Sequence, residues 1–234
     1  MNLADGSKIA PPDVAKSEVQ LLRAFVERAI PARSVVLVTS ALGGDGKSLT
    51  AYSLADCLAR SGRRTAIVDA TTESQHYVRL PNTQRSEQDG ELAVYVPAPK
   101  AKTPLYREAA SRFVETLRSA HEFTIIDSAA LLQSEMAMAL AETVDGVLLS
   151  VRLGRAPAED DEQTLRMLER SAGNVLGVVA ASAEAIEEFE GRGAGAKSGS
   201  LNGISLSWMG SMREAFAGLF AHLRPAGSAS LLRP

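Results

Sequence analysis

Several residue types are scarce in this chain of 234 residues, and each scarcity excludes a class of protein. The single cysteine, Cys57, cannot form a disulfide within the chain and is expected to be a small packing residue. Three histidines, His76, His121 and His222, are scattered, and with one cysteine they give no metal-binding spacing. No Gly-x-Ser-x-Gly motif is present. Disulfide-framework proteins, zinc-site proteins and hydrolases of the nucleophile-elbow type are therefore excluded.

Neither strong charge nor a long apolar run is found. The formal net charge of −3 offers no general attraction to nucleic acid, so we expect no nucleic-acid partner. Residues 1–6 lack the basic start of a signal peptide, and no apolar run approaches the ~20 residues of a membrane-spanning helix. We therefore expect a cytoplasmic protein. With 45% hydrophobic residues, the chain can bury one sizeable core.

Short apolar runs alternate with amphipathic segments along most of the chain. The apolar runs predict strands at 35–40, 65–69, 92–96, 123–127, 145–151 and 175–181. The amphipathic segments predict helices at 15–30, 47–61, 105–120, 131–143 and 157–172. Because the strands are rich in Val, Ile and Leu and are separated by helices, they predict an α/β fold with a mostly parallel sheet and helices on both faces.

Composition divides the chain into four parts. Residues 1–34 form an amino-terminal segment with a helix, residues 35–190 form the α/β core, and the glycine-rich residues 191–203 form a flexible linker. Residues 204–234 are predicted to be an amphipathic helix and a tail, with Trp208 in the apolar stripe of 204–223. That stripe fits three sites: the core of the protein, a groove on a partner, or a membrane surface.

A glycine-rich turn after the first predicted strand is the most informative motif. Residues 39–48, Thr-Ser-Ala-Leu-Gly-Gly-Asp-Gly-Lys-Ser, fit the pattern GxxxxGK[ST], except that Ala41 replaces the first glycine. The glycines let backbone amides turn towards phosphates, and the following helix adds its amino terminus to this anion cradle. Lys47 is placed to reach the β- and γ-phosphates, and the Ser48 hydroxyl to bind Mg²⁺.

The motif thus predicts a single P-loop NTPase-like domain that binds ATP or ADP with Mg²⁺. The predicted nucleotide contacts are Ala41, Leu42, Gly43, Gly44, Asp45, Gly46, Lys47, Ser48 and Leu49.

Carboxylates stand at the ends of two other predicted strands. Asp69 and Asp127 each follow an apolar run, at the sheet edge where the loop is expected to hold its nucleotide. Each Asp is predicted to bind Mg²⁺ with Ser48, directly or through water, although an Asp leaving a strand also caps turns. With Lys47, the two form the predicted catalytic group. Arg152 or Arg155, which follow a predicted core strand at the same edge, is predicted to contact the nucleotide, although such arginines often stay in solvent.

The segments 39–48, 66–69, 124–127 and 145–152 together resemble the ATPase domain of bacterial tyrosine kinases. These CpsD/CapB-like proteins lie within the MinD/ParA group of P-loop ATPases. The resemblance implies a membrane polysaccharide co-polymerase as partner and work in capsule or exopolysaccharide biosynthesis and export. It also implies homo-oligomeric rings, although the helix that links subunits in them survives here only partly, as Glu18 and Arg23. A peripheral position at the inner membrane, through residues 204–223, is the accompanying expectation. MinD and ParA proteins carry a lysine where this chain has Leu42, which favours the polysaccharide branch.

Departures from the family pattern bear on its activity. The family motif Asp-x-Asp, whose second carboxylate is the expected base, reads Asp69-Ala70-Thr71 here, and a threonine cannot accept that proton at neutral pH. The tyrosine-rich tail that these kinases phosphorylate is missing. All four tyrosines precede the last third of the chain: Tyr52, Tyr77, Tyr95 and Tyr106.

Two hypotheses follow from these departures, and one alternative lies outside them. The first is an active kinase whose base is Glu73 or Asp127. The second, which we favour, is a regulatory kinase-like subunit with weak or no tyrosine kinase activity. The alternative is a MinD/ParA-like positioning ATPase, against which Leu42 counts.

Overall fold

The computed structural model describes residues 16–71, 92–95, 107–155, 159–170, 174–191 and 204–207. Within them, one sheet has the strand order β3-β2-β4-β1-β5-β6-β7. Its strands are β1 (Ser34–Thr39), β2 (Thr65–Ala70), β3 (Leu92–Tyr95), β4 (Phe123–Ser128), β5 (Gly146–Arg152), β6 (Val175–Ala181) and β7 (Ile204–Ser207). Neighbouring strands from β3 to β6 are parallel, and β7 pairs with β6 in the antiparallel direction.

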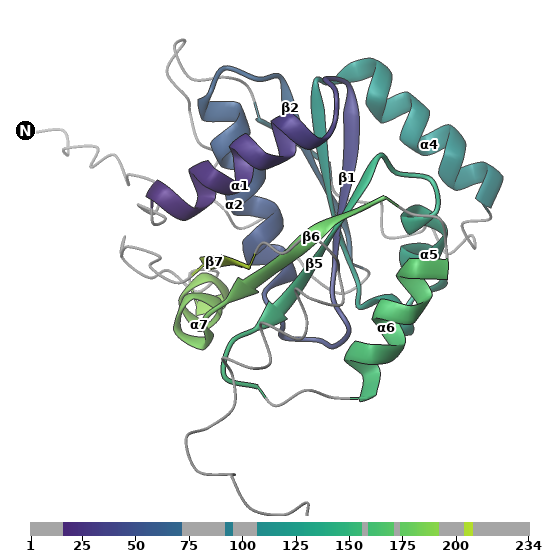
Figure 1. Cartoon of the computed structure of the whole chain (residues 1–234). Helices are drawn as coiled ribbons and strands as arrows, with labels where there is room; N and C mark the ends of the chain where they lie inside the picture. The colour runs from purple at the N-terminus through teal and green to yellow at the C-terminus, as the bar shows by residue number, and fades with distance from the viewer. Residues whose placement is uncertain are drawn as a thin grey trace, which may run out of the picture.

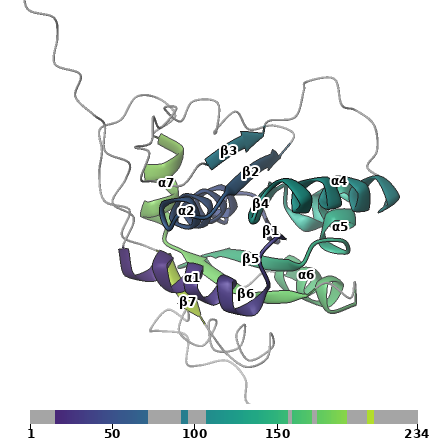
Figure 2. The same cartoon turned by 90° about the horizontal axis from the view of Figure 1, so that it is seen from above.

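Helices cover both faces of this sheet (Figure 1). The helices are α1 (Lys16–Ala29), α2 (Lys47–Arg60), α4 (Arg107–Ala120), α5 (Glu135–Ala141), α6 (Glu159–Arg170) and α7 (Ala183–Gly191), with a short 3₁₀ turn, η1 (Leu131–Gln133). Viewed from above, α1, α2 and α7 lie on one side of the sheet, and α4, α5 and α6 on the other (Figure 2). The predicted α/β fold is therefore confirmed.

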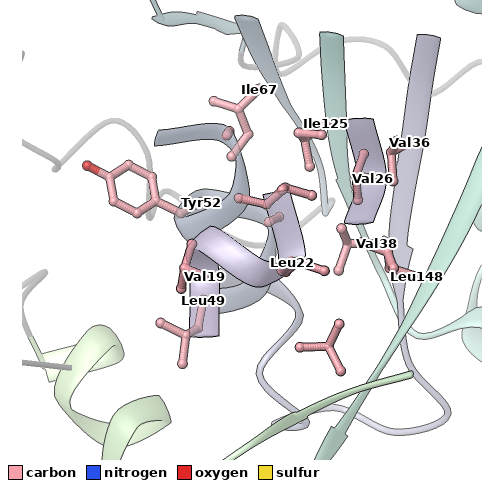
Figure 3. Close-up of a cluster of buried hydrophobic side chains, with 14 of the residues drawn as sticks. Val19, Leu22, Val26, Val36, Val38, Leu49, Tyr52, Ile67, Ile125 and Leu148 are labelled. Carbon is pink, nitrogen blue, oxygen red and sulfur yellow. The ribbon is translucent and has the colours of Figure 1, made fainter. Parts of the chain in front are cut away.

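Strand β1 contributes to two apolar clusters because its side chains alternate between the faces. Val36 and Val38 pack with α1 and α2 in the first cluster (Figure 3), whereas Val35 and Leu37 belong to the second, beneath α4, α5 and α6. All four side chains are fully buried. Cys57, half-buried, packs against the first cluster, as its apolar surroundings in α2 predict. Strand β1, which leads into the glycine-rich loop, is therefore held by apolar packing on both of its faces.

The carboxyl-terminal part of the described chain differs from the sequence prediction. Residues 204–207 form strand β7, so the prediction of a helix beginning at residue 204 is wrong. The alternation of Ile204-Ser205-Leu206-Ser207 is the period of a strand, and the edge of β6 offers it a partner. The rest of the predicted amphipathic helix, from residue 208 onward, lies outside the described residues, as do linker residues 192–203.

Two helical segments also differ from the sequence prediction: one is divided in two, and the other was not predicted. The segment 131–143 is divided into η1 and α5, because the Ser134 side chain accepts a hydrogen bond from the Ala137 amide and begins a new helix. Helix α7 was not predicted, and it extends through Gly191, where the linker was expected to start. In the described part of the chain, no helix combines the length and the apolar character needed to cross a lipid bilayer.

Candidate nucleotide-binding site

The parallel strands bring the predicted site residues to one edge of the sheet. Strand β1 ends at Thr39 and continues through residues 40–46 into α2. Beside it, β2 and β4 pair so that Asp69 stands opposite Asp127. Both aspartates are almost completely buried. The expectation that the loop and the two carboxylates share one edge is confirmed.

Two glycines give the loop its shape. Gly44 and Gly46 have φ angles of 75° and 79°, a left-handed conformation that L side chains rarely adopt. Gly46 is also the N-cap residue of α2, and a Cβ there would lie 2.8 Å from the Cβ of Ala181. At Gly43 and Gly44, by contrast, a Cβ would have no neighbour within 4 Å. The outer side of the loop is therefore open to a ligand.

Lys47 begins α2 and is 9% exposed. Its Nζ donates a hydrogen bond to the Leu42 carbonyl at 3.4 Å, so the side chain reaches back across the loop. Burial lowers the pKa of Lys47, while the charges of Asp127, Asp45 and Glu190 oppose this shift. An ammonium in such a place favours an anionic ligand.

Ser48 and Asp127 are joined directly. The Ser48 Oγ donates to the Asp127 Oδ2 at 2.6 Å, although the two residues are far apart in sequence. A hydroxyl and a carboxylate in contact are the hard oxygen donors that Mg²⁺ prefers. This contact joins the start of α2, just after the glycine-rich loop, to β4.

Thr71 binds Asp69, the other strand-end carboxylate. The Thr71 amide donates to the Asp69 Oδ1 at 3.0 Å, and the Thr71 hydroxyl donates to the same oxygen. Thr71 is therefore a hydrogen-bond donor at the position where the resembled family has a carboxylate, which is an acceptor. The sequence predicted that the Asp69 carboxylate either binds a metal or caps the turn after β2. The capping hydrogen bond from the Thr71 amide is present.

Two arginines, at the end of β5 and just after it, each bind a carboxylate. Arg155 donates from Nε and Nη2 to the two carboxylate oxygens of Asp45, both at 3.2 Å. Arg152 donates to Glu187 of α7 at 3.3 Å. The sequence offered no signal for the pairing of Arg155 with Asp45. The nucleotide contact of Arg152 stays a prediction.

A pocket of about 400 Å³ opens beside the loop, and its size is within the usual range for small-molecule sites. Its lining includes six of the predicted nucleotide contacts, namely Gly43, Gly44, Gly46, Lys47, Ser48 and Leu49. Ala41, Leu42 and Asp45 do not line it. The Asp45 carboxylate is held by Arg155 instead.

Helix α7 forms a wall of this pocket that the sequence prediction missed. Ile186, Phe189 and Glu190 line it, together with Thr71 at the end of β2. The ring of Phe189 packs against that of Tyr52 in α2, with centroids 5.9 Å apart. The signal for α7 was the short spacing between Ile186 and Phe189 after the last predicted strand. The neighbouring glycine-rich residues obscured it.

Comparisons with known proteins agree with this geometry. No protein-family model matches the chain. The chain is 29% identical over 171 residues to the succinoglycan biosynthesis transport protein ExoP of Rhizobium meliloti. This match covers 62% of this chain and only 22% of ExoP. It is 24% identical over 196 residues to the tyrosine-protein kinase CpsD of Streptococcus agalactiae, covering 74% of this chain and 84% of CpsD.

A solved structure has the same fold. The kinase domain of the Escherichia coli tyrosine kinase ETK superposes with a TM-score of 0.59 at 19% identity, covering 69% of this chain and 73% of that domain. The chain is therefore similar in sequence, at low identity, to a polysaccharide biosynthesis transport protein and to a tyrosine-protein kinase. Its fold is that of a bacterial tyrosine-kinase domain.

Proposed function

We propose that this chain is a nucleotide-binding, kinase-like subunit that acts with a membrane polysaccharide co-polymerase in exopolysaccharide or capsule biosynthesis and export. Its role is regulatory, and its tyrosine kinase activity is weak or absent. It works in the cytoplasm, at the inner membrane when its partner is bound, and it assembles with further copies of itself. The observation that carries the nucleotide site is the contact of Ser48 with Asp127 beside Lys47.

The residues present fit a Mg²⁺-bound ATP or ADP. The space above Gly43 and Gly44 is open, so phosphates can approach the loop amides, and Lys47 lies in the same pocket. Ser48 and Asp127 would hold the metal, with Asp69 beside them in register. Bound Mg²⁺ would neutralise negative charge on the phosphates. Lys47, Ser48 and Asp127 suffice to orient a nucleotide for slow hydrolysis.

Efficient tyrosine phosphorylation needs a base that this site does not offer at residue 71. The Thr71 hydroxyl donates to Asp69, and a neutral hydroxyl cannot act as a general base at neutral pH. Asp127, one of the two alternative bases, accepts the hydroxyl hydrogen of Ser48. The other, Glu73, lies outside the described residues. These contacts support a subunit that binds nucleotide without efficient transfer to tyrosine.

The partner is inferred from the relatives. ExoP is named a succinoglycan biosynthesis transport protein, and CpsD a tyrosine-protein kinase. The chain spans only 22% of ExoP, so the transport function of that whole protein does not follow from the match. Because ExoP is named for polysaccharide transport, we infer that this chain acts on polysaccharide export through a membrane partner.

Nucleotide binding is tested with a fluorescent ADP analogue and Mg²⁺. We expect the wild-type chain to bind and Lys47→Ala to lose about 100-fold or more in affinity, because the ammonium is the pocket's phosphate-facing cation. Arg107→Ala, which removes a 75% exposed cation from α4, is the matched control and should bind like wild type. Equal affinity of wild type and Lys47→Ala would contradict the proposed site.

The regulatory role is tested separately. Purified chain incubated with Mg²⁺-ATP should show little phosphotyrosine, and it should co-purify with a co-polymerase encoded beside it. Strong Lys47-dependent autophosphorylation would show an active kinase instead. Nucleotide-dependent dimerisation without any polysaccharide gene nearby would favour the positioning ATPase.

A further inference from the structure

Arg155 lies between two buried carboxylates from different parts of the chain. In addition to Asp45, it binds Asp161 of α6: Nη1 donates to Oδ2 at 2.8 Å, and Nη2 donates to Oδ1 at 2.7 Å. Asp45 is 1% exposed and Asp161 is fully buried. A guanidinium is suited to this place because its planar fork makes two hydrogen bonds to each carboxylate, a bidentate geometry that an ammonium does not match.

Each of the three charges depends on the others. Burial raises the pKa of the Asp45 carboxyl, and the charge and hydrogen bonds of Arg155 oppose that shift. Hydrogen bonding to Asp161 raises the pKa of Arg155, which stays cationic. Without Arg155, two carboxylates would be buried beside each other and repel. The loss would therefore act first on the elements that carry them, the phosphate-binding loop and the first turn of α6.

Asp45 is well placed to transmit such a change to the pocket. It directly precedes Gly46 and Lys47, both of which line the pocket. Its carbonyl accepts a hydrogen bond from the Ser150 hydroxyl of β5 at 2.7 Å, and its Oδ2 accepts one from the Leu42 amide at 3.4 Å. Asp45 is thus held through its carbonyl by Ser150 and through its carboxylate by Arg155 and the Leu42 amide. Arg155 supplies the charged partner of that carboxylate.

We propose that Arg155 is a positioning residue of the nucleotide site, which holds Asp45 against α6 and so keeps the loop in its phosphate-binding shape. This inference rests on the proposed nucleotide binding. Arg155 itself does not touch the nucleotide. Its contribution passes through Asp45 to the amides of residues 43–47, and Asp161 supports it from α6.

Affinity for the fluorescent ADP analogue with Mg²⁺ is the first test. We expect Arg155→Met to weaken binding by about 10- to 100-fold, the range found when groups that orient binding residues are removed. Arg155→Lys should lose less, because it keeps the charge but not the fork. Arg166→Met, which removes a half-exposed arginine from α6, is the matched control and should bind like wild type.

Hydrogen exchange distinguishes positioning from other roles. In Arg155→Met the amides of residues 42–47 should exchange faster, while those of β4 exchange as in wild type. Faster exchange throughout the chain would mean a general structural role. Weaker binding with an unchanged loop would mean direct contact with the nucleotide. Either result would overturn the inference.

Asp161→Asn provides a second route if Arg155→Met does not fold. Alone, this variant should weaken binding. The double variant with Arg155→Lys should bind no more weakly than the weaker of the two single variants, because both changes act through Asp45. Fully additive losses would overturn the inference. If wild type binds and all these variants bind equally, the inference fails and the proposed function stands. If wild type itself does not bind, the proposed function fails.

Discussion

Thr71 shows how one substitution changes the chemistry available at a sheet edge. Its hydroxyl and amide both donate to the Asp69 Oδ1, so that oxygen is engaged by the residue that stands where a second carboxylate is expected. A threonine there stabilises the turn after β2, and it removes a proton acceptor from the pocket that it lines. The site keeps its binding groups and loses a group for chemistry.

Restoring the carboxylate should therefore restore activity. We expect Thr71→Asp to raise Mg²⁺-ATP-dependent phosphotyrosine formation by about tenfold or more, since a positioned general base contributes roughly 10²–10⁴-fold and its placement here is not optimised. Anti-phosphotyrosine blotting and phosphate release measure the change. Thr71→Ala, which removes the hydroxyl and the γ-methyl without adding a carboxylate, is the control and should show no gain. No increase in Thr71→Asp would mean that the missing base is not what limits the reaction.

At the scale of elements, the junction of β1, the loop and α2 is fitted closely to its surroundings. Gly46 occupies a left-handed conformation directly below Ala181 and Ile186, which link the loop to β6 and α7. Gly43, four residues after Thr39, has open space around it instead. Two glycines of one motif thus serve different purposes: close packing at the inner one and ligand access at the outer one.

Alanine substitutions separate these purposes. Gly46→Ala should lower the free energy of unfolding by about 2–4 kcal/mol, because it combines a strained φ angle with overpacking against Ala181. Gly43→Ala, which meets neither obstacle, should change it by less than about 0.5 kcal/mol. Urea denaturation followed by circular dichroism measures both. Equal losses in the two variants would contradict the packing role assigned to Gly46.

The sequence predicted those elements whose signals are local. The apolar runs of β1, β2 and β4 and the loop pattern indicated where Lys47, Asp69 and Asp127 meet, because parallel strands end at a common edge. Arg155 and Asp45 gave no such signal. Their contact joins residues 110 positions apart, and no spacing rule relates them. Strand β7 was missed because its pairing depends on the edge of β6, which is a tertiary feature.

At the scale of the whole molecule, one sheet separates two apolar clusters. Each of the strands β1, β2, β4, β5 and β6 contributes side chains to both clusters. Leu22 of α1 lies in the first cluster and Leu140 of α5 in the second, and both are almost completely buried. Because β1 and β4 contribute side chains to both sides, loss of packing on one face weakens the support of the other. The described part of the chain is expected to unfold as a unit.

Truncation on either face should therefore give the same kind of result. Leu22→Ala and Leu140→Ala should each lower the free energy of unfolding by about 2–5 kcal/mol, and each should leave a single urea transition. Leu21→Ala, beside Leu22 but 62% exposed, is the matched control and should have little effect. Two separate transitions in either core variant would show that the faces unfold independently.

The central position of β1 has a consequence for the order of folding. Strand β1 is complete before residue 40, yet its hydrogen-bonded neighbours, β4 and β5, lie in the 120s and the 140s. Pairing over such long separations is slow to form, and a chain grows from its amino terminus during synthesis. The glycine-rich loop therefore leaves the ribosome before β4, β5 and α6, and it gains their support only after α6 has followed. Nucleotide cannot guide the first steps of folding, and it can stabilise only a chain that has already assembled.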